Sequence, residues 1–185
     1  MRADLHSILI DEATISARLD ALAAEITRDY EGKALSVLVI LHGGMFLMAD
    51  LLRRIEIPLR IESLTASSYH GGTSTSGQVL FPPTPLPDVH GRHVLILDDI
   101  LDTGLTLHAV RQRLIEEASA ASVRTCVLLK KRKARDTMAN PDYAGFSIGD
   151  EFVVGYGLDF DGYYRHLPYI GVLKDSVIAN HQRTP

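Results

Sequence analysis

Apolar and polar residues follow one another along this chain in blocks that predict strands separated by helices. Three blocks are almost wholly apolar, as expected of strands that a parallel sheet buries on both faces, and they span residues 35–41, 94–97 and 123–129. Further strands are expected over residues 57–63, 151–156 and 169–173. Apolar residues at helical spacing predict helices over residues 11–29, over residues 45–54 and along Leu107, Val110, Leu114 and Ala118. This alternation indicates an α/β fold with a mostly parallel, right-handed sheet and helices on both faces.

Two long polar segments interrupt the pattern. Residues 65–88 are rich in Ser, Thr, Gly and Pro, and residues 130–150 are basic and expected to be irregular. Loops of this length in a compact domain are usually functional or disordered, so residues 65–88 fit either a lid that excludes water or a mobile surface excursion. The chain shows no internal repeat and no linker, which predicts a single domain over residues 1–185.

Composition narrows the class of protein. A chain of 185 residues can bury a core without disulfide or metal staples, and its net charge of −4 argues against a general nucleic-acid binder. The one cysteine, Cys126, lies in an apolar run and is expected to be a core residue in a reducing compartment. No segment resembles a signal peptide or a membrane span, so we expect a cytoplasmic protein without a membrane partner.

The most informative stretch follows the strand at residues 94–97. Asp98, Asp99 and Asp102 precede a Thr-Gly-Leu-Thr turn over residues 103–106, and a helix comes next. Ligands bind at the carboxyl ends of parallel strands, and unpaired N–H groups at a helix start favour phosphate. Two adjacent carboxylates repel each other unless a cation or a hydroxyl-rich ligand lies nearby. An ordinary capped turn is the alternative, but the strand before and the helix after favour a ligand site.

This pattern resembles the signature of type I phosphoribosyltransferases, which bind phosphoribosyl pyrophosphate. Lys131 and the segments 141–146, 151–159 and 164–170 resemble the hypoxanthine-guanine phosphoribosyltransferases of that family, as do residues 41–44, and residues 65–69 resemble their flexible loop. The similarity covers most of residues 10–175. It implies the type I fold, with a twisted parallel sheet, a flexible loop and a small hood formed from the termini. It also implies purine salvage, in which a 6-oxopurine and phosphoribosyl pyrophosphate give IMP or GMP and pyrophosphate.

The resemblance assigns the donor nucleotide to the acidic strand end and the turn. Asp98 and Asp99 match carboxylates near the ribose hydroxyls, and Asp102 matches an acid that exchanges a proton near purine N7. The full set of residues implied to bind phosphoribosyl pyrophosphate or nucleotide is Asp98, Asp99, Ile100, Asp102, Thr103, Gly104, Leu105 and Thr106.

The resemblance assigns the base and the metal to four later residues. Lys131 matches a donor to the purine 6-oxo group, which an ammonium selects over the amino group of adenine. Phe152 matches a ring that stacks on the base, and Val153 matches a residue that reads it through the backbone. Asp159 matches a purine-site residue and a ligand of Mg²⁺, the implied cofactor. On composition alone, Lys131 belongs to a solvated basic run, Phe152 to the core and Asp159 to a turn.

The remaining implied contacts are with pyrophosphate. They come from His42, Gly43, Gly44 and Arg165, and from Ser68 and Tyr69 in the flexible loop. Relatives often carry Lys or Arg where this chain has His42, with a cis peptide bond before it, and some carry Lys in place of Leu105. No Lys or Arg occurs between Ile61 and Gly91. We therefore expect ordinary chemistry with weaker or more magnesium-dependent binding of phosphoribosyl pyrophosphate.

Two other functions remain open at this stage. A regulatory sensor of phosphoribosyl pyrophosphate should carry a basic face and lack base-binding residues, which the acidic charge and Lys131 disfavour. The second alternative is an enzyme for another base, such as xanthine, adenine or a pyrimidine. Lys131 disfavours adenine, but hypoxanthine, guanine and xanthine share the 6-oxo group, so the sequence does not rank them. Relatives form dimers or tetramers, so a homodimer or homotetramer is expected.

Overall fold

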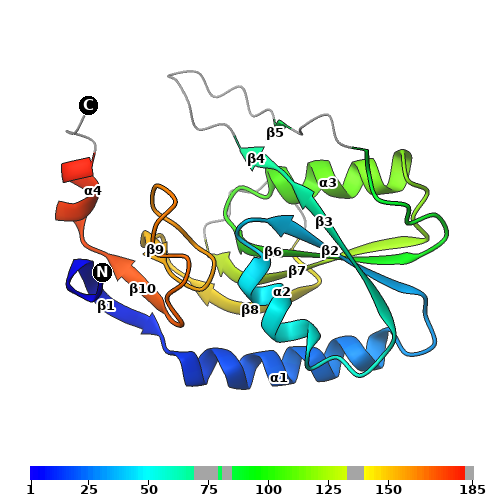
Figure 1. Ribbon diagram of the computed structural model, residues 1–185, viewed down its shortest axis with the longest axis horizontal. Helices are drawn as coiled ribbons and strands as arrows, with labels where there is room; N and C mark the ends of the chain where they lie inside the picture. Colours follow the sequence, from blue (N-terminus) through cyan, green and yellow to red (C-terminus); the bar gives the residue numbers. More distant parts are fainter. Residues whose placement is uncertain (69–78, 81–84, 133–139, 182–185) are drawn as a thin grey trace.

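A five-stranded parallel sheet lies at the centre of the computed structural model, which describes residues 1–68, 79–80, 85–132 and 140–181 (Figure 1). The strand order is β3-β2-β6-β7-β8, and all four neighbouring pairs are parallel. The strands are β2 (Leu35–Leu41), β3 (Leu59–Thr65), β6 (His93–Leu101), β7 (Ser122–Lys131) and β8 (Tyr143–Ile148). The predicted parallel α/β sheet is confirmed.

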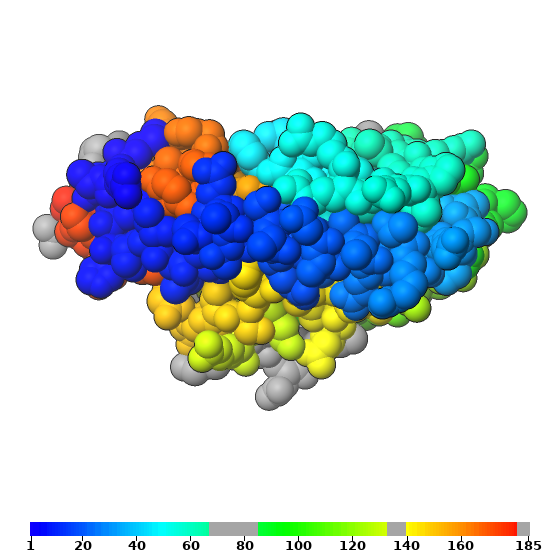
Figure 2. Space-filling model, turned by 90° about the horizontal axis from the view of Figure 1, so that it is seen from below, coloured from blue at the N-terminus to red at the C-terminus, as the bar shows by residue number. Residues whose placement is uncertain are grey.

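Helices cover both faces of this sheet. Helices α1 (Glu12–Asp29) and α2 (Met45–Leu52) share one apolar cluster with the sheet, and α3 (Leu105–Glu116) packs in a second cluster on the other face. Figure 2 shows α1 and α2 lying side by side on the surface seen from below. Helix α1 starts where the Asp11 carboxylate accepts a hydrogen bond from the Thr14 N–H at 2.7 Å, an N-cap. Across the described residues, no helix combines the length and the apolar character needed to cross a membrane.

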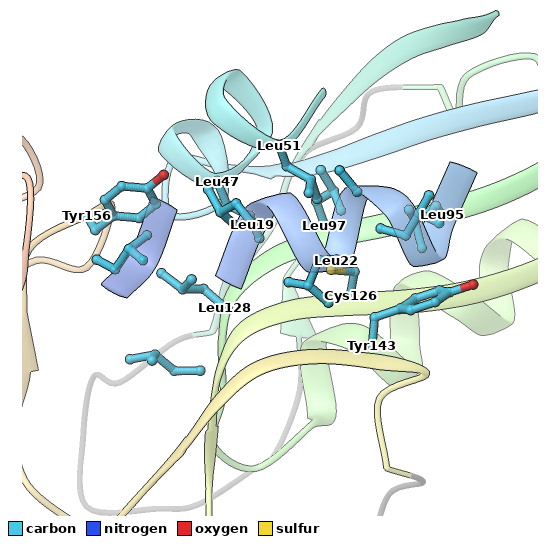
Figure 3. Close-up of a cluster of buried hydrophobic side chains, with 14 of the residues drawn as sticks. Leu19, Leu22, Leu47, Leu51, Leu95, Leu97, Cys126, Leu128, Tyr143 and Tyr156 are labelled. Atoms are coloured by element: carbon cyan, nitrogen blue, oxygen red, sulfur yellow. The ribbon is translucent and has the colours of Figure 1, made fainter. Parts of the chain in front are cut away.

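The larger cluster joins α1 and α2 to the sheet (Figure 3). Its fully buried members include Leu19, Leu22, Leu47, Leu51, Leu95 and Leu97. Cys126 lies among them without any exposed surface, which confirms its prediction as a core residue, and burial raises the pKa of its thiol to about 12. The thiolate is therefore disfavoured, as in unreactive core cysteines.

A second sheet, which we call the hood, combines both ends of the chain. It has the antiparallel order β1-β10-β9, formed by β1 (Leu5–Ile10), β10 (Ile170–Leu173) and β9 (Val153–Val154). A 3₁₀ turn (Arg2–Asp4) precedes it and α4 (Asp175–His181) follows it, so the first and the last described elements lie at one end of the molecule (Figure 1). This arrangement agrees with the hood that the resemblance implied.

Part of the expected element pattern is wrong. Residues 143–148, expected to be irregular, form β8 at the edge of the sheet, where a Cβ on Gly145 would lie 2.5 Å from the Leu128 carbonyl oxygen. The strand expected over residues 151–156 reduces to β9, because residues 155–157 turn with positive φ. Strand β3 begins two residues later than expected, and α2 and α3 end at Leu52 and Glu116.

The long polar segment is described only at its ends. Strands β4 (Ser67–Ser68) and β5 (Val79–Leu80) pair antiparallel. Tyr69 lies outside the described residues and only the backbone of Ser68 is described, so their assignment to a lid stays a prediction.

Candidate active site

The carboxyl ends of β2, β3 and β6 surround a cavity of about 690 Å³, which we call the central cavity. Parallel strands bring their carboxyl ends to one edge of the sheet, where α/β proteins bind ligands. The cavity is lined by Ile40, Leu41, His42, Gly43, Thr65, Ala66, Asp98, Asp99, Ile100, Leu101, Asp102, Thr103, Gly104, Thr106, Leu107, Asp159 and Arg165. Eleven of the predicted site residues are therefore brought together in one place.

Asp98 and Asp99 lie near the carboxyl end of β6 rather than in a loop after it. The Asp99 N–H donates to the Asp98 carboxylate at 3.0 Å, and the Ile100 N–H donates to the Asp99 carboxylate at 2.8 Å. Burial and repulsion by Asp99 raise the pKa of the Asp98 carboxyl well above its usual range. Burial also raises the pKa of Asp99, although hydrogen bonds and the charge of Arg165 act in the opposite direction. The pair therefore favours a proton, a cation or hydroxyl donors beside it.

The turn after these acids has the geometry of a phosphate site. Gly104 caps α3 with a φ of +76°, a conformation that glycine adopts readily. Helix α3 starts at Leu105, so its first N–H groups lack intrahelical partners and the positive end of its dipole faces this turn. Thr103, Gly104 and Thr106 line the cavity, whereas Leu105 is exposed and does not.

Asp102 lines the central cavity and pairs with Lys131, which is not part of the cavity wall. The Lys131 ammonium lies 3.1 Å from the Asp102 carboxylate, although Asp102 follows β6 and Lys131 is the last residue of β7. The Asp102 side chain is 59% exposed and that of Lys131 only 20%. The structure thus places an accepting carboxylate and a donating ammonium next to each other at the open end of the site.

The loop over residues 42–44 lies against the acidic pair. The Leu41–His42 peptide bond is cis, as the resemblance implied. A Cβ on Gly43 would lie 2.1 Å from a carboxylate oxygen of Asp99, so any larger residue here would displace the Asp99 side chain. Gly44 caps α2 and is buried behind the loop, outside the cavity wall.

Asp159 and Arg165 form an ion pair on the hood side of the cavity. The guanidinium Nη2 lies 2.7 Å from one Asp159 oxygen, and the other Asp159 oxygen accepts from the Gly162 N–H at 2.7 Å. Each oxygen keeps a lone pair beyond these contacts.

Phe152 and Val153 are not part of the cavity wall. Phe152 is 44% exposed and packs edge-on against Phe160 with ring centroids 5.5 Å apart, and Val153 is buried in β9. Their roles toward a base stay predictions.

Thr65 and Ala66 line the cavity but were not predicted as site residues. Their place at the carboxyl end of β3 is a signal by which sequence reasoning could have found them.

The carboxylate side chains that line the central cavity suit a hard cation that also coordinates the bound ligand. Among residues 1–68, 79–80, 85–132 and 140–181, no three His, Cys, Asp or Glu side chains are grouped closely enough to hold a metal ion. Asp98, Asp99 and Asp159 nevertheless line the same cavity, and the metal ligands that these side chains offer are carboxylate oxygens. Mg²⁺ typically binds one or two carboxylates together with substrate phosphates and water, so these residues fit it.

Comparison with known proteins places the chain in a family. Residues 8–161 match the phosphoribosyl transferase domain. The chain is 42% identical to the hypoxanthine-guanine phosphoribosyltransferase of Streptococcus pneumoniae over 177 residues, which are 96% of this chain and 98% of that protein. It is 41% identical to the Staphylococcus aureus enzyme of the same name over 180 residues, or 97% and 100% of the two chains.

Solved structures agree with the sequence comparison. The crystal structure of a hypoxanthine phosphoribosyltransferase from Staphylococcus aureus superimposes with a TM-score of 0.88 at 41% identity and covers 96% of both chains. A Trypanosoma cruzi hypoxanthine phosphoribosyltransferase superimposes with a TM-score of 0.89 at 36% identity and covers 97% of both chains. The acidic strand end, the phosphate turn and these full-length similarities together make this chain a member of the phosphoribosyltransferase family, in the group of hypoxanthine-guanine phosphoribosyltransferases.

Proposed function

We propose that the protein transfers the 5-phosphoribosyl group from phosphoribosyl pyrophosphate to a 6-oxopurine, hypoxanthine or guanine, and releases pyrophosphate. The observation that carries this proposal is the cluster at the end of β6, where three acids and a helix-capping turn share the central cavity. The names of the full-length relatives support the same reaction.

The central cavity can hold the donor in one orientation. The 5′-phosphate accepts hydrogen bonds from N–H groups of the turn over residues 103–106, and the ribose hydroxyls donate to Asp98 and Asp99. The diphosphate then reaches the loop at Gly43 and the guanidinium of Arg165. This orientation leaves C1 of the ribose between the acidic pair and the Asp102–Lys131 pair.

The reaction exchanges one bond at C1 for another. The bond from C1 to the diphosphate oxygen breaks, and a bond from C1 to purine N9 forms. Positive charge develops on the ribose, where the carboxylates stabilise it, and negative charge develops on the leaving diphosphate beside Arg165. Lys131 donates to the purine 6-oxo group, and Asp102 accepts the proton that the base loses near N7.

Asp159, with Asp98 and Asp99 nearby, is the residue we propose as a ligand of Mg²⁺. When bound, the cation neutralises diphosphate charge and stabilises the leaving group. Asp159 already holds Arg165 at 2.7 Å, so this carboxylate also orients a cationic side chain toward the diphosphate.

We further propose that the whole chain acts as one cytoplasmic domain and assembles as a homodimer or homotetramer. The Trypanosoma cruzi structure comes from work on the role of that protein's C-terminal region in its oligomeric state and enzymatic activity. Light scattering on the purified protein measures the assembly directly.

A turnover assay with five nucleobases tests the proposed function. Purified protein, Mg²⁺ and phosphoribosyl pyrophosphate are incubated with hypoxanthine, guanine, xanthine, adenine or uracil, and the nucleotide product is measured. We expect IMP and GMP, with little product from adenine or uracil. Binding of phosphoribosyl pyrophosphate without any nucleotide product would contradict the proposal and favour a regulatory sensor. The His42→Lys variant, in the same assay, tests whether His42 in place of Lys weakens binding of the donor. If it does, the KM of the variant for phosphoribosyl pyrophosphate falls below that of the wild type.

A further inference from the structure

Three consecutive residues behind the central cavity have left-handed backbone conformations. The φ angles are +101° at Gly155, +51° at Tyr156 and +104° at Gly157. Glycine adopts such angles at little cost, but tyrosine does so rarely and only where its surroundings hold it. The Tyr156 N–H donates to the Leu167 carbonyl at 2.8 Å, and the contacts of the Tyr156 side chain hold the turn in addition.

Those contacts tie the turn to α2. The Tyr156 hydroxyl donates to the Asp50 carboxylate at 2.6 Å, and its ring lies 6.4 Å from that of Phe46. The side chain is 6% exposed and lies at one end of the buried cluster in Figure 3. Burial and the neighbouring Asp50 carboxylate raise the pKa of the Tyr156 hydroxyl, so it stays a neutral donor in enzyme assays.

The same turn fixes two parts of the diphosphate side of the cavity. The Gly157 carbonyl accepts from Arg165 Nη1 at 2.5 Å, and the Gly157 N–H donates to the Arg165 carbonyl at 2.9 Å. A Cβ on Gly157 would lie 2.1 Å from the Gly43 carbonyl oxygen, so the turn also packs directly against the loop at Gly43. Displacing this turn would move Arg165 and Gly43 together.

We propose that the Tyr156–Asp50 hydrogen bond is a positioning contact for diphosphate recognition, resting on the proposed function. Neither residue belongs to the wall of the central cavity. They act through the turn at Gly157, which sets the guanidinium of Arg165 and the backbone of Gly43 where the diphosphate binds. The contact therefore governs the affinity for phosphoribosyl pyrophosphate rather than for the purine.

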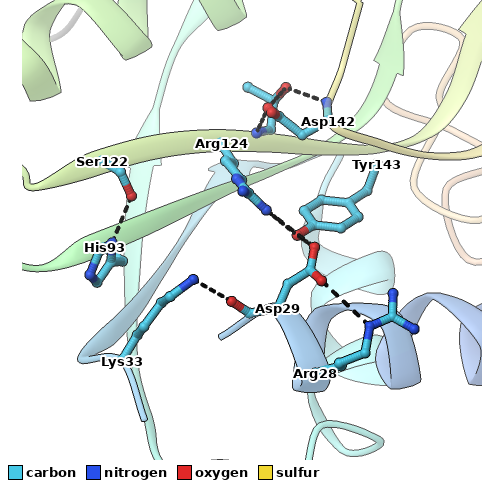
Figure 4. Close-up of polar contacts among 9 residues, drawn as sticks. Arg28, Asp29, Lys33, His93, Ser122, Arg124, Asp142 and Tyr143 are labelled. Carbon is cyan, nitrogen blue, oxygen red and sulfur yellow. Dashed lines mark hydrogen bonds and ion pairs between the residues drawn. The ribbon is translucent and has the colours of Figure 1, made fainter. Parts of the chain in front are cut away.

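The chain offers a matched control contact away from the cavity. The Tyr143 hydroxyl donates to the Asp29 carboxylate at 2.8 Å, and this bond joins β8 to α1, as the Tyr156–Asp50 bond joins a turn to α2 (Figure 4). Tyr143 is 4% exposed and lies at the other end of the buried cluster from Tyr156 (Figure 3). Neither member of this contact lines the cavity.

The test compares Tyr156→Phe with Tyr143→Phe. Both changes remove one hydroxyl from a buried tyrosine, so both should lower the midpoint of thermal unfolding. Only Tyr156→Phe should raise the KM for phosphoribosyl pyrophosphate, by about tenfold, because a misplaced positioning group impairs binding at a distance. The KM for hypoxanthine should stay within about twofold of the wild type in both variants, as for changes that leave a site untouched.

A second pair of variants tests the acceptor. Asp50→Asn keeps an oxygen that accepts from the Tyr156 hydroxyl, whereas Asp50→Ala removes it. We expect Asp50→Asn to keep a KM near that of the wild type and Asp50→Ala to match Tyr156→Phe. This pair answers the question even if Tyr156→Phe does not fold, because the Asp50 side chain is partly exposed.

Calorimetric titration with magnesium pyrophosphate, run on the same variants, separates two kinds of failure. If the wild type makes IMP but Tyr156→Phe and Asp50→Ala keep its KM and pyrophosphate affinity, the positioning inference is overturned and the proposed function stands. A wild type that makes no nucleotide and binds no pyrophosphate overturns both.

Discussion

At the scale of single residues, we propose that the contact between Asp102 and Lys131 sets the base specificity. Purine N7 and the 6-oxo group are neighbours on one edge of the base. A carboxylate and an ammonium 3.1 Å apart can contact both atoms at once, the carboxylate as acceptor and the ammonium as donor. We therefore expect the purine edge to bind beside this ion pair.

Replacing Lys131 by Ala should remove the preference for a 6-oxo group. We expect kcat/KM for hypoxanthine to fall by roughly 10- to 100-fold, because the Asp102 carboxylate loses its partner and the carbonyl loses its donor. Steady-state kinetics with hypoxanthine and adenine measure the change. The control is Lys130→Ala, since Lys130 binds Asn140 instead. Equal losses in both variants would sink the carbonyl-reading role.

Replacing Asp102 by Asn tests proton transfer separately from binding. The amide oxygen still accepts a hydrogen bond but does not take the proton, so kcat should fall by about 10²- to 10⁴-fold. The KM for hypoxanthine should change much less. Asp175→Asn, in the first turn of α4, is the matched surface control. A kcat for Asp102→Asn equal to that of the wild type would exclude the proton-transfer role.

Some of these residues can be predicted from the sequence and others cannot. Asp98 to Thr106 are contiguous and carry their own context of strand and helix, so reading the chain predicts them. Lys131 is found only through the family resemblance, because a run of basic residues is usually solvated. Tyr156 and Asp50 are 106 residues apart, and no local pattern links them.

At the scale of elements, β6 carries two carboxylates that oppose folding of the free protein. Burial and mutual repulsion raise the pKa of Asp98, so the folded state binds its proton more tightly than the unfolded chain does. This contribution to stability is full below the unfolded pKa and is lost as the pH rises through the higher folded pKa. The free enzyme should therefore lose folding stability as the pH rises from the unfolded pKa of Asp98 to its higher folded pKa.

Asp98→Asn removes this pH-dependent loss and keeps the oxygen that accepts from the Asp99 N–H. We expect the variant to have a midpoint of thermal unfolding a few degrees, roughly 2 to 6 °C, above the wild type near neutral pH. Its kcat/KM for phosphoribosyl pyrophosphate should fall. Unfolding midpoints measured across pH check the first expectation, and a lower midpoint for the variant at every pH would contradict it.

The two glycines that flank β6 separate stability from phosphate binding. Gly91 and Gly104 have φ angles of +67° and +76°, so alanine at either should cost about 1 kcal/mol of folding stability. Only Gly104→Ala alters the phosphate turn, and only this variant should raise the KM for phosphoribosyl pyrophosphate. Denaturant unfolding and kinetics on both variants check this, and a normal KM for Gly104→Ala would refute the phosphate role of the turn.

The elements that the sequence failed to predict share a physical cause. Strand β8 contains Gly145, Ala144 and Ser147, which have weak strand propensity, and its position is decided by close approach to β7. Strand β1 has exposed residues at four of its six positions, and it pairs with β10 from the opposite end of the chain. Central strands are long apolar runs and were predicted, whereas these edge and terminal strands depend on tertiary contacts.

At the scale of the whole molecule, the central cavity draws on both sheets. The parallel sheet supplies the acids and the phosphate turn, and the segment that ends in the hood supplies Asp159 and Arg165. Phosphoribosyl pyrophosphate bound across both parts should stabilise the fold, because a ligand that binds only the folded state shifts the unfolding equilibrium.

Isothermal titration with magnesium phosphoribosyl pyrophosphate measures whether the donor binds at the acidic end of β6. We expect saturable binding at one site per chain, weakened by about tenfold or more in the Asp98→Asn/Asp99→Asn double variant, a loss of at least roughly 1.4 kcal/mol. No measurable binding by the wild type, or undiminished binding by the double variant, would contradict the claim that the donor occupies the acidic end of β6.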